Sequence, residues 1–156
     1  MKDDFASITI HDSIFFHSVY GSLSRQNFYL SSLSTSNQIY NRDCDKQNFY
    51  YESIQVKVNK SGYYSFHGES TVYIYGFIYK NTFNPLNPLE NSLHAEVIRE
   101  SNFLFTFNIR LSGDTTYVLV VTTNLLKETG TFSIVVLGSD MVTLKRLSEY
   151  LCFCIV

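Results

Sequence analysis

The chain has 156 residues, of which 45% are hydrophobic and 17% charged, with a formal net charge of −2. This length fits one domain, and the hydrophobic fraction is too high for a disordered chain. The near-neutral charge argues against nucleic-acid binding, which needs a basic surface to neutralise phosphates. The 12 Tyr and 13 Phe residues, with abundant Val, Ile and Thr, favour β-strands throughout.

The first 46 residues have a less regular pattern than the rest. Short strands are expected at residues 7–10, 14–18 and 27–30, and the Ser-, Asn- and Asp-rich stretch 31–45 is expected to be a loop. Polar residues interrupt the one apolar stretch near the start, so no signal peptide is visible. We expect this segment to belong to the same domain as the strands that follow it.

The clearest strand is residues 49–58, where Ile54, Val56 and Val58 alternate with polar residues. A turn follows at residues 59–62, where Gly62 would supply a positive φ, and a second strand at 63–67 would complete a β-hairpin. The turn contains the glycosylation sequence Asn59-Lys60-Ser61. Asn59 is therefore a candidate for glycosylation if the chain enters the secretory pathway.

The next segment, residues 72–79, is apolar on both faces. Gly76 within it suggests a bulge or a close backbone approach. Tyr73, Tyr75 and Tyr79 share one face of this predicted strand and are the candidate ligand-binding residues, because an aromatic strip can stack on sugars or bind a partner. The alternative is that this strip is simply the second covered face of an interior strand.

A long loop is expected at residues 80–92, marked by two Asn-Pro dipeptides, and it is the other candidate for a binding face. Strands at 103–111, 115–123 and 132–136 follow, separated by Gly-containing turns. This spacing is typical of a β-sandwich or barrel. Leu144, Leu147 and Leu151 have helical spacing, so a short C-terminal helix is expected in the tail, residues 139–156.

No pattern of reactive side chains predicts an enzyme or a cofactor. The four histidines are scattered, and no nucleophile motif such as Gly-x-Ser-x-Gly occurs. Three cysteines, Cys44, Cys152 and Cys154, fit neither a disulfide framework nor a zinc site with its second pair of ligands. No run approaches the roughly 18 apolar residues of a membrane span.

Several motifs between residues 47 and 138 resemble the pre-peptidase C-terminal (PPC) β-sandwich domains, including the PPC-like repeats of extracellular proteins of small invertebrates. They are Tyr50-Tyr51-Glu52, Gly62-Tyr63-Tyr64-Ser65-Phe66, Tyr75-Gly76-Phe77-Ile78-Tyr79, the Asn-Pro loop, Thr116 to Thr123, and Gly130-Thr131-Phe132-Ser133-Ile134. The resemblance implies a jelly-roll-like sandwich that acts as an accessory module.

The resemblance also bears on calcium. Members of that family often carry an acidic run after the Asn-Pro loop, whereas Glu96 is the one carboxylate near that place here. A calcium site takes six to eight oxygen ligands. No metal is therefore expected, and Glu96 is the only weak candidate ligand.

Taken together, the sequence predicts an all-β, antiparallel β-sandwich with its core at residues 47–138. The expected function is a non-catalytic binding, adhesion or accessory module that contacts a protein or a carbohydrate, outside the cell and as part of a longer protein. The alternatives are an intracellular β-sandwich that binds a protein partner, or the remnant of a larger receptor or hydrolase chain.

Overall fold

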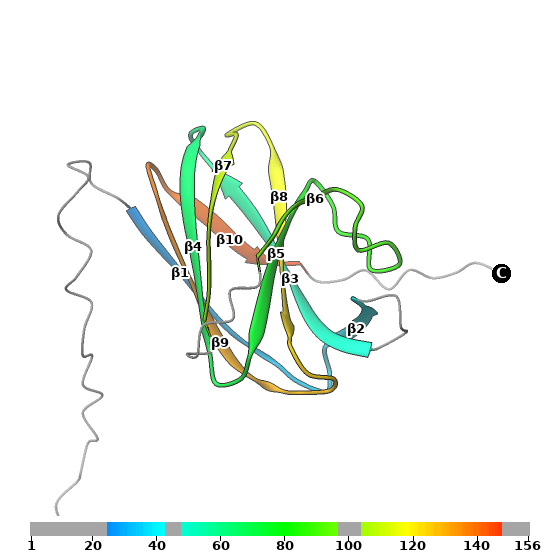
Figure 1. The fold of residues 1–156 in the computed structure, drawn as a ribbon. Helices are drawn as coiled ribbons and strands as arrows, with labels where there is room; N and C mark the ends of the chain where they lie inside the picture. The colour runs from blue at the N-terminus through cyan, green and yellow to red at the C-terminus, as the bar shows by residue number, and fades with distance from the viewer. Residues whose placement is uncertain (1–24, 43–47, 97–103, 148–156) are drawn as a thin grey trace, which may run out of the picture.

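The computed structural model describes residues 25–42, 48–96 and 104–147. For residues 94–96 and 104 it describes the backbone alone. The described residues form ten strands and no helix (Figure 1). The strands are β1 (Arg25–Leu33), β2 (Gln38–Asn41), β3 (Asn48–Val58), β4 (Gly62–Ser70), β5 (Ile74–Lys80), β6 (Ser92–Glu96), β7 (Leu104–Leu111), β8 (Thr116–Thr123), β9 (Gly130–Gly138) and β10 (Val142–Arg146).

The strands form two packed antiparallel sheets, which confirms the predicted β-sandwich. The four-stranded sheet has the order β1-β9-β4-β7. The six-stranded sheet has the order β10-β3-β8-β5-β6, and β2 pairs with the first part of β3 on the same side as β10. From β3 to β9, successive strands lie in alternate sheets, except that β5 and β6 are neighbours in the same sheet. This is the jelly-roll arrangement.

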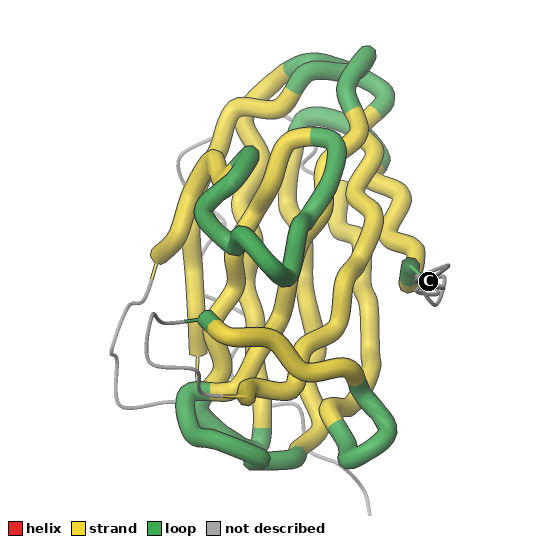
Figure 2. Tube along the Cα trace, turned by 90° about the vertical axis from the view of Figure 1, so that its right-hand side faces the viewer, coloured by secondary structure: helices red, strands yellow, loops and turns green. Residues whose placement is uncertain are grey.

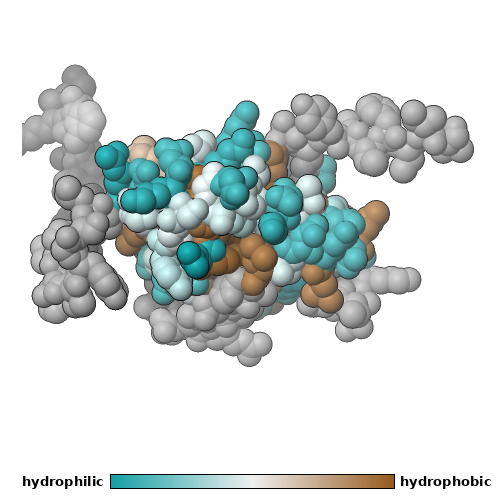
Figure 3. Space-filling view, turned by 90° about the horizontal axis from the view of Figure 1, so that it is seen from above, coloured by the Kyte–Doolittle hydropathy of each residue, from teal (hydrophilic) through white to brown (hydrophobic). Residues whose placement is uncertain are grey.

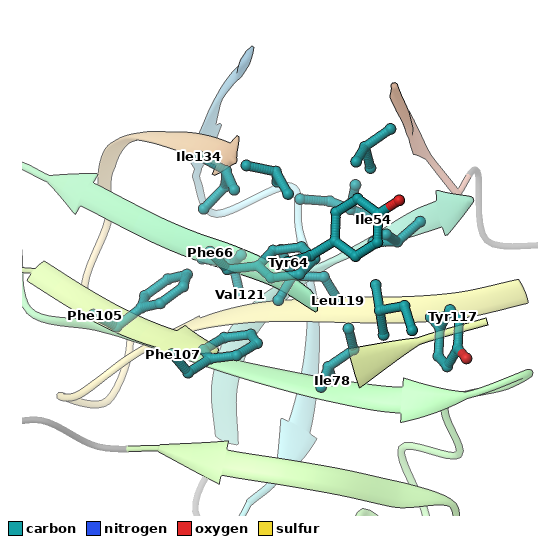
Figure 4. Packing of buried hydrophobic residues seen from close by; sticks show 14 of the residues in the cluster. Ile54, Tyr64, Phe66, Ile78, Phe105, Phe107, Tyr117, Leu119, Val121 and Ile134 are labelled. Atoms are coloured by element: carbon teal, nitrogen blue, oxygen red, sulfur yellow. The ribbon is translucent and has the colours of Figure 1, made fainter. Parts of the chain in front are cut away.

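The main core fills the space between the sheets, and every strand except β2 and β6 contributes residues to it, mostly at alternate positions (Figure 4). Phe105 of β7 illustrates how tightly the sheets meet. Its ring lies against Gly68 of the same sheet and Gly76 of the opposite sheet, where an added Cβ would come within 2.2 and 2.6 Å of ring carbons. The group that approaches Gly76 is this side-chain ring, where the sequence suggested a backbone, and any larger residue there would displace the ring.

The predicted hairpin of residues 49–67 is wrong. β3 pairs with β8, β10 and β2, whereas β4 pairs with β7 and β9, so the turn between them crosses from one sheet to the other. Gly62 does not have a positive φ. Its small size is explained instead by Ser139, whose Oγ would lie 2.6 Å from an added Cβ.

The predicted C-terminal helix is wrong within the described residues. Val142–Arg146 is strand β10, paired with β3 in the register Val142↔Val58. Val142 and Leu144 face the main core, while Leu147 packs on the other side of the sheet. The side chains of this segment therefore alternate between the two faces of the sheet, as in a strand, although the leucine spacing fits a helix. Leu151 lies outside the described residues.

The expected loop at residues 31–45 also contains regular structure. β1 continues to Leu33, and β2 forms at residues 38–41 because it can pair with β3. The strands expected at residues 7–10 and 14–18 lie outside the described residues.

Candidate functional site

A second hydrophobic cluster covers the outer face of the six-stranded sheet. We call it the outer aromatic cluster. Its centre is Tyr40, Tyr51, Tyr79 and Phe83, and the Phe83 ring centroid lies 5.4, 5.3 and 4.8 Å from those of the three tyrosines, respectively. Such separations are typical of edge-to-face and tilted aromatic contacts. Phe83 comes from the loop between β5 and β6, residues 81–91, so this loop is held on the sheet by its own aromatic side chain.

The base of the β5–β6 loop is closed by backbone hydrogen bonds. The Lys80 N–H donates to the Asn91 carbonyl at 2.9 Å, and the Asn81 N–H donates to the Thr116 carbonyl at 2.8 Å. Asn81 and Asn91 have φ values of 65° and 60°, a left-handed conformation that Asn tolerates better than most residues. Figure 1 shows the loop extending from the ends of β5 and β6 on the outer side of this sheet, and Figure 2 views the molecule from that side.

The tip of the loop consists of two successive turns of the same sequence, Asn84-Pro85-Leu86 and Asn87-Pro88-Leu89. The Asn87 N–H donates to the Asn84 carbonyl and the Glu90 N–H donates to the Asn87 carbonyl, both at 3.0 Å. The Asn84 side chain accepts a further bond from the Leu86 N–H at 3.1 Å. Proline in the second position of each turn fixes φ, so the backbone of the tip is preorganised.

This tip presents two leucines to solvent. Leu86 is 94% exposed and Leu89 is 83% exposed, the two highest values among the large hydrophobic residues that the structure describes. Figure 3 views the sandwich from the end where this loop begins, and shows a mainly hydrophilic surface with separate hydrophobic groups. A single exposed leucine is ordinary, but two on adjacent hydrogen-bonded turns form a defined apolar surface.

The three candidate tyrosines occupy different environments. Tyr79 is buried in the outer aromatic cluster, and burial raises its pKa to about 12. Tyr75 is half-buried, and its hydroxyl donates to the Asn124 side chain. Tyr73 precedes β5 and is exposed. They therefore do not form one exposed strip, because most of that strand face is covered.

Arg42 covers the ring of Tyr75. Its guanidinium carbon lies 4.6 Å from the Tyr75 ring centroid and 3.9 Å from that of Phe49. The same guanidinium donates to the Thr123 carbonyl at 2.8 Å. These cation–π and hydrogen-bond contacts attach the end of β2 to β8. The covered ring face is not available for stacking on a sugar.

Glu52 is a buried carboxylate at one border of the main core. It accepts hydrogen bonds from the Tyr29 hydroxyl at 2.5 Å and the Ser31 hydroxyl at 2.9 Å, and Arg146 lies 3.2 Å away. Burial, followed by the hydrogen bond to Glu52, raises the pKa of Tyr29. The network connects β1 of one sheet to β3 and β10 of the other. Every contact of Glu52 is thus structural.

Two shallow hollows lie on either side of the turn between β1 and β2. One, of about 400 Å³, opens beside Glu52 and Arg146, and the other, of about 410 Å³, is lined in part by Asn48 and Tyr50. Within the described ranges, no three His, Cys, Asp or Glu residues come together as a metal site would require. Nor does this part of the chain form any helix that could cross a membrane.

The remaining candidates are placed as follows. Asn59 is exposed in the turn between β3 and β4, where its side chain is accessible. Glu96 is the last residue of β6, and its backbone is paired with Gly76 of β5.

Sequence reasoning missed the part played by the repeated Asn-Pro-Leu. The repeat itself was a usable signal, because two identical turns in succession predict an ordered tip rather than an irregular loop. It also missed Arg42 and Glu52. Glu52 shares the inward face of β3 with Ile54, Val56 and Val58, and a charged residue on an apolar face indicates a polar partner from elsewhere in the chain.

No family model matches the sequence, and no curated protein matches it either. Among solved structures, the chain is similar to the Yersinia pseudotuberculosis-derived mitogen (YPM), with a TM-score of 0.49 and 11% sequence identity. That match covers 82% of this chain and 98% of the mitogen chain. The likeness is too distant to carry a function, and the resemblance to PPC domains stays a prediction.

Proposed function

We propose that this protein is a non-catalytic binding module that contacts a protein partner through the β5–β6 loop. The observation that carries the proposal is the pair Leu86 and Leu89, held almost fully exposed on two hydrogen-bonded turns. A preorganised apolar tip loses little conformational entropy on binding, which favours affinity. A partner with a concave apolar surface would bury both side chains.

A protein is a better fit to this tip than a bilayer or a glycan. Membrane-binding surfaces place Lys or Arg beside their apolar residues, whereas Glu90 is the only charged residue of the loop. Glycan binding generally uses an exposed aromatic face, but Tyr79 is buried and Tyr75 is covered by Arg42. Leucine side chains without an adjacent aromatic face suit an apolar protein pocket.

The wider setting of the module remains part of the proposal. An extracellular adhesion or accessory role within a longer protein follows from the resemblance to PPC domains. The exposed position of Asn59 is compatible with glycosylation in that setting. A protein-binding role inside the cell would use the same loop and would leave Asn59 unmodified.

The loop can be tested by affinity capture with matched variants. The wild-type chain, the double variant Leu86→Asn/Leu89→Asn and the control Leu125→Asn are immobilised in equal amounts. Leu125 is 57% exposed in the connection between β8 and β9, outside this loop. Proteins captured by wild type and control should be depleted about tenfold or more with the double variant, the loss expected for about 1.4 kcal/mol or more.

Binding of one such protein is then measured directly with all three chains. Equal affinity for wild type and the double variant would contradict the proposal. Two further probes test the rival ligands, namely phosphatidylserine-containing vesicles and a glycan array. Leucine-dependent binding to vesicles alone, or glycan binding that the double variant retains, would replace the protein partner with a lipid or a sugar.

A further inference from the structure

The four-stranded sheet ends in a strand that is unusually open to pairing. We propose that β1 pairs with β1 of a second copy of this chain, forming an antiparallel, two-fold symmetric dimer. The proposal uses the opposite sheet from the β5–β6 loop and does not depend on the proposed function. Among the described residues, β1 pairs only with β9, and in Figure 1 it forms one border of its sheet.

The other sheet borders carry features that discourage such pairing. β2 and β6 are only four and five residues long, and the register of β6 is irregular. β10 is five residues long and exposes Lys145 and Arg146, and β7 exposes Arg110. Short length, irregular register and exposed charge are the ways in which proteins protect sheet edges from another chain.

β1 is neither short nor irregular, and its charge is confined to one end. It is nine residues long and pairs with β9 in unbroken register from Arg25↔Gly138 to Leu33↔Gly130. Its only charged residue is Arg25, at its first position, and it contains no proline. A long and regular edge whose eight residues after Arg25 are uncharged is a template for a further strand.

β1 is also self-complementary. A two-fold axis at Tyr29 lets all nine residues of β1 pair with β1 of the second copy. In this register Phe28 of each copy lies opposite Leu30 of the other. Phe28 is 63% exposed and Leu30 is 68% exposed on the outer face. Arg25 would lie opposite Leu33 of the second copy, so the register opposes no like charges. Aromatic–aliphatic pairs across antiparallel strands stabilise a sheet.

The other face of β1 is already occupied, which fixes the side on which the dimer forms. Tyr29 and Ser31 point inward and bind Glu52. In the amide orientation that satisfies both groups, Asn27 bonds the backbone of Val142 in β10, at 2.9 and 3.2 Å. These contacts hold β1 straight against the sandwich. The backbone edge of β1 that no described strand pairs with, and its outer side chains, are left for the second copy.

Sedimentation velocity over a concentration series tests the proposal with the full chain. Wild type should show a monomer–dimer equilibrium. Phe28→Lys/Leu30→Lys would place like charges opposite each other in both pairs, so dimerisation should weaken by at least about a hundredfold. The matching variant Phe28→Glu/Leu30→Glu should also be monomeric. An equimolar mixture of the two variants should form a heterodimer, because opposite charges then face each other.

Tyr63→Lys is the control, because Tyr63 is 74% exposed on β4 of the same outer face but lies away from the β1 edge. It should dimerise like wild type. Hydrogen exchange should show β1 amides becoming protected as concentration rises, while β7 amides do not change. A wild-type chain that stays monomeric at every concentration would overturn the proposal. So would a dimer that Tyr63→Lys disrupts, or one in which β1 amides stay unprotected.

Discussion

The two outer faces of the sandwich are built from similar strands but differ in solvent exposure. On the six-stranded sheet, Tyr79 points outward from β5 and is only 2% exposed. On the four-stranded sheet, Tyr63 points outward from β4 and is 74% exposed. The same residue type in the same kind of strand is therefore a core residue on one face and a surface residue on the other.

The difference in exposure follows from the outward-facing residues of each strand. Outward residues of β5 and β8, together with Phe49 and Tyr51 of β3, are mainly apolar, and the β5–β6 loop, β2 and Leu147 pack over them. Outward residues of β4 include Ser65, His67 and Glu69, and no segment among the described residues covers them. Strands that are apolar on both sides indicate two covered faces, whereas alternating strands indicate one.

Replacing the two tyrosines by alanine should give the largest contrast between the faces. Tyr79→Ala removes a buried ring and leaves a cavity beneath Phe83, so unfolding should become easier by about 3–5 kcal/mol. Tyr63→Ala should change the free energy of unfolding by no more than about 0.5 kcal/mol. Urea denaturation of both variants, followed by circular dichroism, measures the difference. Similar losses for the two variants would mean that the outer aromatic cluster is not packed in solution.

Alkaline pH should distinguish the faces next, through the raised pKa of Tyr79. Its pKa is about 12 in the folded chain and close to 10 when unfolded. Between these values the unfolded state has already lost the proton that the folded state keeps, so stability falls as pH rises. In Tyr79→Phe, the decrease in the free energy of unfolding with rising pH should be smaller by about 2 kcal/mol.

The control is Tyr63→Phe, on the exposed face. Denaturation midpoints for wild type and both variants are measured from pH 9 upward, to the highest pH at which unfolding stays reversible. The wild-type and Tyr63→Phe curves should run parallel, and the Tyr79→Phe curve should be flatter. Three parallel curves would show that the Tyr79 hydroxyl is solvated.

Much of the fold was accessible from the sequence, because alternation reports burial directly. Ile54, Val56 and Val58 alternate with polar residues and lie in the main core as predicted. The two-sided apolar pattern around Tyr79 correctly suggested a strand covered on both faces as one of two interpretations. Gly76 marked the site where a ring from the opposite sheet makes a close approach.

Connections between sheets were not accessible in the same way. A short turn between two alternating strands predicts a hairpin, but β3 and β4 join different sheets. Local sequence does not distinguish a turn within a sheet from one that crosses the sandwich, because both need only polar, flexible residues. The prediction of a helix in the C-terminal tail was wrong for a related reason. Leu144 and Leu147 fit a helical period, and only pairing with β3 selects the strand.

The candidate site was predictable in location but not in form. The Asn-Pro loop was predicted to be long and was one candidate for the binding face, yet its order depends on Phe83 reaching tyrosines from β2, β3 and β5. Such contacts between distant segments leave no local pattern. The ring of Tyr75 was likewise expected to bind ligand, whereas Arg42 from a separate segment occupies it.

The smallest expected effect concerns His67, on the exposed face. Its ring nitrogens lie 2.8 Å from the Ser65 hydroxyl and 3.3 Å from the Thr106 hydroxyl. Burial lowers the pKa of His67, and the nearby Glu69 carboxylate partly opposes this by raising it. Below about pH 6.5 the unfolded state therefore takes up a proton before the folded state does, and stability falls slightly with decreasing pH.

An NMR titration of the imidazole protons should show a His67 signal with a pKa below that of a free histidine, assigned by its loss in His67→Gln. Glu69→Gln should lower this pKa further, because it removes the one charge that favours the protonated ring. A pKa at or above the ordinary value would mean that water reaches the ring freely. The polar row of β4 would then be more open than its contacts with Ser65 and Thr106 imply, and the contrast with the covered face would be sharper still.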